Sequence, residues 1–134
     1  MRFTKPVHLI RFHPDEQLSP HFKGVELGCP CGECMGRGII ALELIDALER
    51  LRAIVGKPLR INSGYRCPTY NRRIGGRPDS YHQLGCAVDV SAVGIGVNEL
   101  ARAAREAGFS GVIKYKARNF VHMDLRLQPI EAEL

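Results

Sequence analysis

One stretch of the sequence, residues 63–89, limits the fold more than any other part of the chain. It reads SGYRCPTYNRRIGGRPDSYHQLGCAVD, and its glycines, prolines and polar residues favour turns over regular structure. A long run of turn residues inside a compact domain is uncommon and usually functional. The stretch carries His82 and Asp89, and His122 follows on a later alternating segment. Two histidines and one aspartate are a ligand set for a catalytic zinc ion, so we expect a metal site here.

The surroundings of Asp89 support this expectation. Residues 86–91 alternate between two sets of side chains, which predicts a strand with Asp89 on its more polar face. An aspartate between two valines is costly unless a metal or another cation pairs with it. A catalytic zinc ion takes three protein ligands and leaves a fourth position for water, whose pKa falls to about 7.

The apolar periodicity of the remaining chain predicts an α+β fold. Apolar residues recur every three or four positions over residues 39–55, before Gly56 and Pro58, and again over residues 97–107. Both segments are therefore expected to be amphipathic helices. Short strands are expected near Leu59, Cys86, Gly111 and Phe120. We expect these strands to form a small antiparallel sheet with the two helices packed on it.

The last of these strands supplies a second polar face. Val121, Met123 and Leu125 are expected to point to the core. The opposite face then carries Phe120, His122, Asp124 and Arg126. Asp124 is therefore a candidate catalytic carboxylate. An equally good interpretation makes it a carboxylate that orients a ligand histidine.

The length of 134 residues suits a single domain, with residues 1–19 as an extended arm and residues 127–134 as a tail. No apolar run approaches the roughly 20 residues that span a bilayer, and the N-terminus lacks the apolar core of a secretory signal. We therefore expect a monomer that is made in the cytoplasm and does not insert into membranes. The net charge of +5 favours acidic partners, but the basic residues are scattered, so we expect no nucleic-acid site.

Four cysteines form a second group of interest. Cys29, Cys31 and Cys34 lie close together, and Cys67, which precedes a proline in the loop, is a candidate to join them in space. The odd total of five cysteines argues against a full disulfide framework. No second CxxC or HxxxH follows at the spacing of a zinc ribbon. A second, structural metal ion, one disulfide and unpaired reduced thiols therefore all remain open.

Four motifs in order give the chain a resemblance to a known family. They are SGYR, GG, SxHxxGxAxD and HxD, at residues 63–66, 75–76, 80–89 and 122–124. With their surroundings, from about Phe22 to Arg126, they resemble the zinc D-Ala-D-Ala carboxypeptidase family of peptidoglycan peptidases (peptidase family M15). The likeness is closest to its short bacterial and phage branch. The resemblance implies a hedgehog/DD-peptidase-like fold and zinc-dependent hydrolysis of a peptide bond in the peptidoglycan stem or cross-link.

The resemblance also implies roles for individual residues. It makes His82, Asp89 and His122 the zinc ligands, Arg66 the group that binds the substrate carboxylate or the developing oxyanion, and Ser80 a residue that helps to hold the peptide. A guanidinium suits this role because it binds a carboxylate through two directed hydrogen bonds. The alternative for Arg66 is a structural role in pinning the loop.

One position departs from the family pattern. Some branches place a glutamate, the general base, three residues before the last histidine ligand, and Asn119 stands there in this chain. Related metallopeptidases carry a histidine two residues before it, where this chain has Phe120. The resemblance therefore assigns no base. Asp124 is the first candidate, and Tyr115 and Lys114 are weaker ones.

Three functions follow from these observations. The first is a cell-wall peptidase, either a carboxypeptidase or an endopeptidase, for example a phage-type endolysin. The second is a non-catalytic, zinc-containing wall-binding or phage structural module, which the missing base motivates. The third is a nucleic-acid-binding zinc protein built on the cysteine cluster, which leaves the two histidines and the aspartate unexplained.

Overall fold

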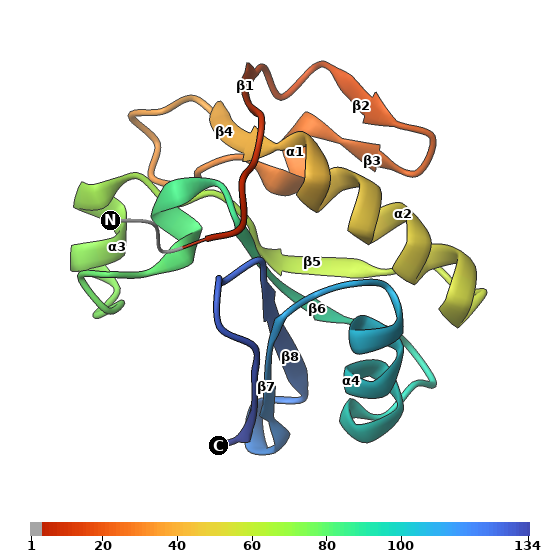
Figure 1. The fold of residues 1–134 in the computed structure, drawn as a ribbon. Coiled ribbons are helices and arrows are strands. Elements are labelled where there is room, and N and C mark those ends of the chain that lie inside the picture. The colour runs from red at the N-terminus through yellow and green to blue at the C-terminus, as the bar shows by residue number, and fades with distance from the viewer. Residues whose placement is uncertain (1–3) are drawn as a thin grey trace.

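The structure, a computed structural model, describes residues 4–134 and centres on a five-stranded sheet (Figure 1). In sheet order the strands are β5 (Arg60–Ser63), β6 (Ala87–Ser91), β8 (Phe120–Asp124), β7 (Gly111–Tyr115) and β9 (Ile130–Glu133). Neighbouring strands are antiparallel except β7 and β9, which are parallel. The α+β class is confirmed, as are the four expected strands. The fifth strand, β9, comes from the segment that the sequence predicted to be a tail.

Two helices cover the apolar face of the sheet. α2 (Leu42–Val55) contacts α4 (Val97–Glu106), and α4 packs on β7 and β8. The shared core contains Leu44, Leu48, Leu51, Leu100, Val88, Val90, Val112, Val121 and Met123, each at most 1% exposed. The helices leave the opposite, more polar face of the central strands free to line a site.

The start that the sequence predicted for the first helix, over residues 39–55, is wrong. Gly38–Ala41 instead forms β4, which pairs antiparallel with β1 (Leu9–Phe12). No side chain caps α2 at its first turn, so the strongest local signal for a helix start is missing. Pairing with a distant strand outweighs the helical periodicity here. The helix ends as expected at Gly56, which takes the left-handed conformation with a φ of 72°.

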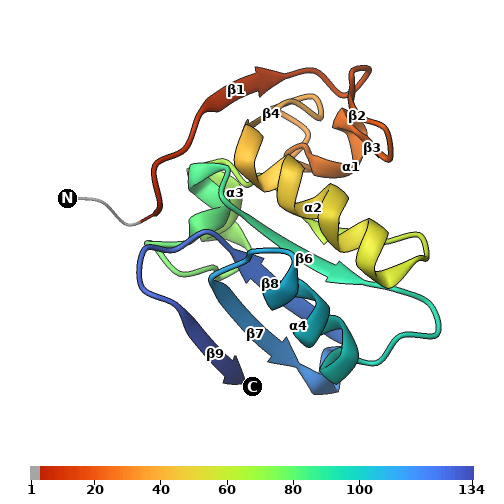
Figure 2. The same cartoon turned by 45° about the vertical axis from the view of Figure 1, so that its right-hand side comes forward.

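The N-terminal segment is more ordered than an extended arm. β2 (Gln17–Ser19) and β3 (Phe22–Lys23) form a short antiparallel pair, and the helix α1 (Gly24–Leu27) follows. Figures 1 and 2 show these elements grouped with β1 and β4 at one end of the molecule, beside α2. The first three residues of the predicted arm lie outside the described residues.

The turn-rich stretch between β5 and β6 contains two short helices. α3 (Pro68–Arg73) starts at a proline, whose fixed φ suits the first turn of a helix, and the 3-10 helix η1 (Tyr81–Leu84) contains His82. Ser80 caps η1, because its Oγ accepts a hydrogen bond from the His82 N–H at 3.2 Å. A second 3-10 helix, η2 (Lys116–Arg118), joins β7 to β8. Among residues 4–134, no helix combines the length and the apolar character needed to cross a membrane.

Candidate metal centre

Three elements bring the predicted ligands together. Asp89 in β6 stands directly opposite His122 in the antiparallel register of β8, so both side chains leave the same face of the sheet. His82 comes from η1, which Ser80 caps and which Gly85 ends with a φ of 71°. A side chain at Gly85 would also collide with the backbone of β4, so this turn requires glycine.

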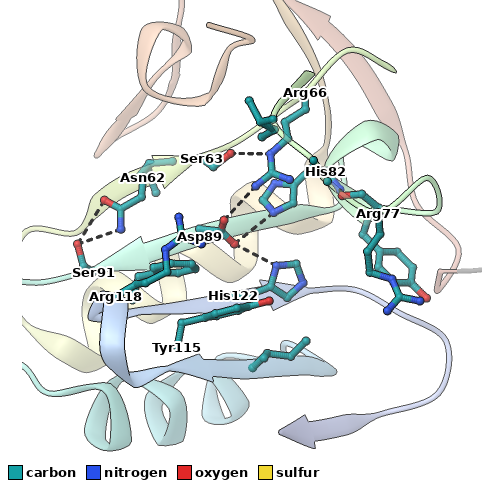
Figure 3. A pocket seen from close by; sticks show the side chains of 18 of the residues that line it. Asn62, Ser63, Arg66, Arg77, His82, Asp89, Ser91, Tyr115, Arg118 and His122 are labelled. Atoms are coloured by element: carbon teal, nitrogen blue, oxygen red, sulfur yellow. Dashed lines mark hydrogen bonds and ion pairs between the residues drawn. The ribbon is translucent and has the colours of Figure 1, made fainter. Parts of the chain in front are cut away.

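The three side chains converge on one point (Figure 3). One ligand atom from each lies within 4.8 Å of the others. His82 Nε2 is 3.2 Å from Asp89 Oδ1, and His122 Nδ1 is 3.0 Å from the same oxygen. The side chains of His82, Asp89 and His122 expose only 3%, 9% and 12% of their surface. Nitrogen and oxygen donors are thus concentrated in a small volume formed by largely buried side chains.

The hydrogen bonds of the two rings fit a cation at this point. The remaining ring nitrogens also face oxygen: His82 Nδ1 is 2.8 Å from the Gly64 carbonyl, and His122 Nε2 is 2.7 Å from Asp124 Oδ2. A neutral imidazole carries only one N–H, so it cannot donate to two acceptors. Either both rings are doubly protonated, or a metal ion takes the place of the second proton. Two imidazoles and one carboxylate are a donor set that zinc binds with a fourth position open.

The charges within the centre keep Asp89 ionised. Burial alone would raise its pKa, but hydrogen bonds from His122 and His82 outweigh burial and hold the pKa well below its usual range. Burial alone would lower the pKa of His122, but Asp124 and Asp89 outweigh it and raise that pKa. The centre therefore favours positive charge, as protons or as a metal ion.

Arg66 lies beside the centre and is held on three sides. Its guanidinium donates to Ser63 Oγ at 3.0 Å, to Asn71 Oδ1 at 3.3 Å and to Asp89 Oδ2 at 3.2 Å. Asn71 is itself buried and donates to the Arg77 carbonyl at 2.8 Å. A guanidinium has five N–H donors, so about two remain after these contacts. Arg66 is therefore fixed by its loop and still able to donate to a ligand.

Asp124 lies behind His122 and is shielded from solvent. Its carboxylate is fully buried, accepts from His122 Nε2 and pairs with the Arg126 guanidinium through both oxygens. Burial alone would raise its pKa, but Arg126 and His122 outweigh it and lower the pKa to about 2. These contacts favour the second of the two interpretations, in which Asp124 orients a ligand histidine.

The centre opens into a cleft of about 1210 Å³. Ser80, Tyr115 and Asn119 line this cleft together with the two ligand strands. Asn119 carries no ionisable group, so it cannot serve as a base. Lys114 is not one of the lining residues, and its ammonium group instead donates to Asn98 Oδ1 at 3.2 Å.

Two side-chain contacts in the site were not predicted from the sequence. Ser63 accepts from Arg66 three positions later, a spacing within the SGYR motif that points to local pairing. Arg126 pairs with Asp124, and opposite charges two positions apart on one strand face are the signal for it. The four cysteines do come together, but as a second group that does not line the cleft.

Comparison with known proteins points to one family. The sequence model described as Peptidase M15 matches residues 20–124. The peptidoglycan L,D-endopeptidase MepK of Escherichia coli is 36% identical over 88 residues, which are 60% of this chain and 48% of that protein. The zinc D-Ala-D-Ala carboxypeptidase of Streptomyces albus G is 38% identical over 74 residues, which are 54% of this chain and 29% of that protein. The chain thus spans about half the length of the first relative and less of the second.

Proposed function

Because the chain belongs to the peptidase M15 family, we propose that it is a zinc-dependent peptidase that hydrolyses a peptide bond in the stem or cross-link of peptidoglycan. The observation that carries the proposal is the buried group of His82, Asp89 and His122, whose ligand atoms lie within 4.8 Å at the floor of a cleft. One relative is named an endopeptidase and the other a carboxypeptidase, so the proposal covers both positions of cleavage.

The three ligands would hold one zinc ion, which when bound supplies a Lewis acid and a nucleophile at neutral pH. The Gly64 carbonyl fixes the ring of His82 with Nε2 toward the centre. The Asp124 carboxylate does the same for His122, whose Nδ1 faces Asp89. Both rings therefore present a nitrogen to the same point before any ion arrives.

Arg66 is proposed to contact the substrate. Its remaining N–H donors are positioned to bind a carboxylate or a developing oxyanion, and a donor that is already fixed need not reorganise during the reaction. Ser63 and Asn71 supply that fixation. Ser80, whose hydroxyl caps η1 at the edge of the cleft, is proposed to help hold the peptide.

We assign Asp124 the role of a positioning residue for His122 and not that of the general base. Both of its oxygens are already engaged, and its side chain exposes no surface to a substrate. This assignment leaves Tyr115 as the remaining candidate base in the cleft. The incomplete set of proton-transfer groups is the observation that favours a second candidate function, a non-catalytic zinc-containing wall-binding or phage structural module.

The proposal extends to the setting in which the chain acts. A net charge of +5 would favour adsorption to an anionic cell wall, so we propose that it acts there as a monomer, with a phage-type endolysin as one form of this role. The antiparallel order β5-β6-β8-β7, with helices on one face, supports the proposal of a hedgehog/DD-peptidase-like fold.

Digestion of purified sacculi tests the function. The zinc-loaded chain should release muropeptides, and their masses identify the bond that is cut. His82→Ala should reduce release to background, because the metal loses one of three ligands. A chelator should do the same, and added zinc should reverse it. His13→Ala is the matched control: His13 is exposed and outside the cleft, so this variant should keep wild-type activity.

The same assay separates the two candidate functions. A folded chain that carries zinc and binds sacculi, but releases no muropeptide under any condition, would exclude the peptidase and leave the wall-binding module. Release that persists in His82→Ala would exclude the metal centre as the site of reaction.

A further inference from the structure

We propose that Cys29, Cys31, Cys34 and Cys67 form a second metal site that binds one structural zinc ion. Their four Sγ atoms all lie within 4.8 Å of one another. In a tetrahedral site with Zn–S bonds of about 2.3 Å, the sulfur atoms are about 3.8 Å apart. The separation of 3.9 Å between Cys31 Sγ and Cys67 Sγ is close to this value.

The loop that carries three of the cysteines is folded tightly around this point. Gly32, Met35 and Gly36 all have positive φ, at 84°, 56° and 76°. Met35 is a non-glycine residue in this region, and 67% of it is exposed, so packing offers little compensation for its backbone strain. A metal ion bound to the thiols at the centre of the loop would supply that compensation.

Backbone donors point at three of the four sulfur atoms. The N–H of Cys34 donates to Cys31 Sγ at 3.3 Å, that of Cys67 to Cys29 Sγ at 3.4 Å, and that of Tyr70 to Cys67 Sγ at 3.4 Å. Sulfur accepts such bonds best as a thiolate, which is also the form that binds zinc. The N–H groups therefore offset part of the negative charge that four thiolates bring to one divalent ion.

The ligand set indicates a structural and not a catalytic ion. Four protein sulfur atoms complete the coordination of zinc and leave no position for water. Cys67 is the N-cap of α3 and follows Arg66 directly in sequence. An ion at this site would therefore tie the loop at residues 29–34 to the segment that carries the proposed substrate-binding arginine.

Disulfide formation is the competing arrangement. One disulfide would remove two ligands from the group, and two disulfides would remove all four. All five cysteines are free thiols in the structure, including Cys86, which is buried elsewhere. The two arrangements differ in thiol count and in metal content, so both can be measured.

The experiment uses the full chain purified with zinc and without oxygen or reductant. Wild type should contain close to two zinc ions per chain, whereas His122→Ala and Cys34→Ser should each contain close to one. X-ray absorption of the His122→Ala chain should show a Zn–S shell at about 2.3 Å, and the Cys34→Ser chain should be dominated by nitrogen and oxygen at about 2.0–2.1 Å. Cys86→Ser is the matched control and should keep both ions, because Cys86 lies outside the group.

Two results would overturn the proposal. The first is a His122→Ala chain without zinc, or with zinc that has no sulfur neighbours. This readout needs no cysteine variant, so a misfolded Cys34→Ser chain does not block the test. The second is fewer than five reactive thiols in the denatured, chelated chain, which would indicate disulfides. None of these readouts uses peptidase activity, so the second site and the proposed function fail independently.

Discussion

The two carboxylate oxygens of Asp89 face different partners, and this division links the candidate metal centre to the proposed substrate-binding arginine. Oδ1 faces both histidines, whereas Oδ2 accepts from Arg66. Replacing Asp89 would therefore remove a proposed metal ligand and, at the same time, one of the three acceptors that fix the Arg66 guanidinium. The Arg66 guanidinium donates its hydrogen bonds to Ser63, Asn71 and Asp89, so substitution at His82 removes none of them and tests metal binding more cleanly.

Asp124→Asn tests whether this residue positions His122 or acts as the base. If it positions the ring, the loss of the charged acceptor should weaken zinc binding by about 10- to 100-fold. If it is the base, zinc affinity should stay at the wild-type value while kcat falls. The measurement is zinc affinity by competition with a chromogenic chelator, together with kcat on the same preparations.

Asp79→Asn is the matched control for this substitution. Asp79 lines the cleft, its side chain is 71% exposed, and among the described residues it pairs with Arg77. This variant should keep wild-type zinc affinity. A comparable loss in both variants would show that the effect comes from the charge of the cleft and not from contact with His122.

At the scale of residues, the sequence predicted which side chains come together at the candidate metal centre. It did not predict which of them hydrogen-bond to one another. Alternation along residues 120–126, which include β8, places His122, Asp124 and Arg126 on one face. The structure confirms that these side chains meet. Alternation cannot tell which of them faces a ligand and which is covered. That distinction depends on neighbouring elements, such as the Tyr81 ring, which lies 4.9 Å from the Arg126 guanidinium.

Among the elements, strand β7 helps to position the candidate metal centre because it pairs with β8, which carries His122 and Asp124. Gly111 starts this strand and pairs directly with Asp124 in β8. A Cβ atom at Gly111 would overlap the Asp124 carboxylate and the Arg126 guanidinium. The absence of a side chain at this position therefore makes room for the pair that orients His122. In the sequence Gly111 is only a glycine at the start of a strand, and a bulge or a tight bend would place glycine there equally well.

Gly111→Ala should disturb the centre without touching any ligand. Overpacking of this kind typically costs about 1–3 kcal/mol, and the displaced carboxylate should also weaken zinc binding. Urea unfolding and chelator competition measure the two effects. Gly96→Ala is the control, because a Cβ there meets nothing within 4 Å. That variant should leave zinc affinity unchanged, even if the loss of a glycine N-cap costs some stability. Wild-type zinc affinity in Gly111→Ala would contradict the supporting role of β7.

For the whole molecule, local patterns predicted the strands and helices that bury a clear apolar face. They failed where an element depends on a distant partner. β4 was taken as the first turn of α2 because its pairing with β1 spans a long stretch of sequence. β9 has mostly exposed side chains and is held by backbone pairing with β7, and its alternation of Ile130 and Ala132 with two glutamates covers only four residues, too few to distinguish a strand from a tail. The four cysteines were likewise left undecided, because only the fold brings Cys67 to the others.

The distribution of charge over the whole molecule leads to the last prediction. The cleft is lined by Arg60, Arg66, Arg77, Arg118 and Arg126, against two acidic residues, Asp79 and Asp89. Such a surplus should attract an anionic peptide, and salt should screen the attraction. Arg118, whose guanidinium lies 5.1 Å from the centre of the Phe120 ring, lines the cleft and is not one of the proposed metal ligands. Arg118→Gln should raise KM about two- to five-fold at low salt, with little change in kcat, and the difference should vanish near 1 M salt. Arg11→Gln removes the same charge from the exposed face of β1 and should leave KM unchanged. An equal rise in both variants would mean that net charge, and not the lining of the cleft, attracts the substrate.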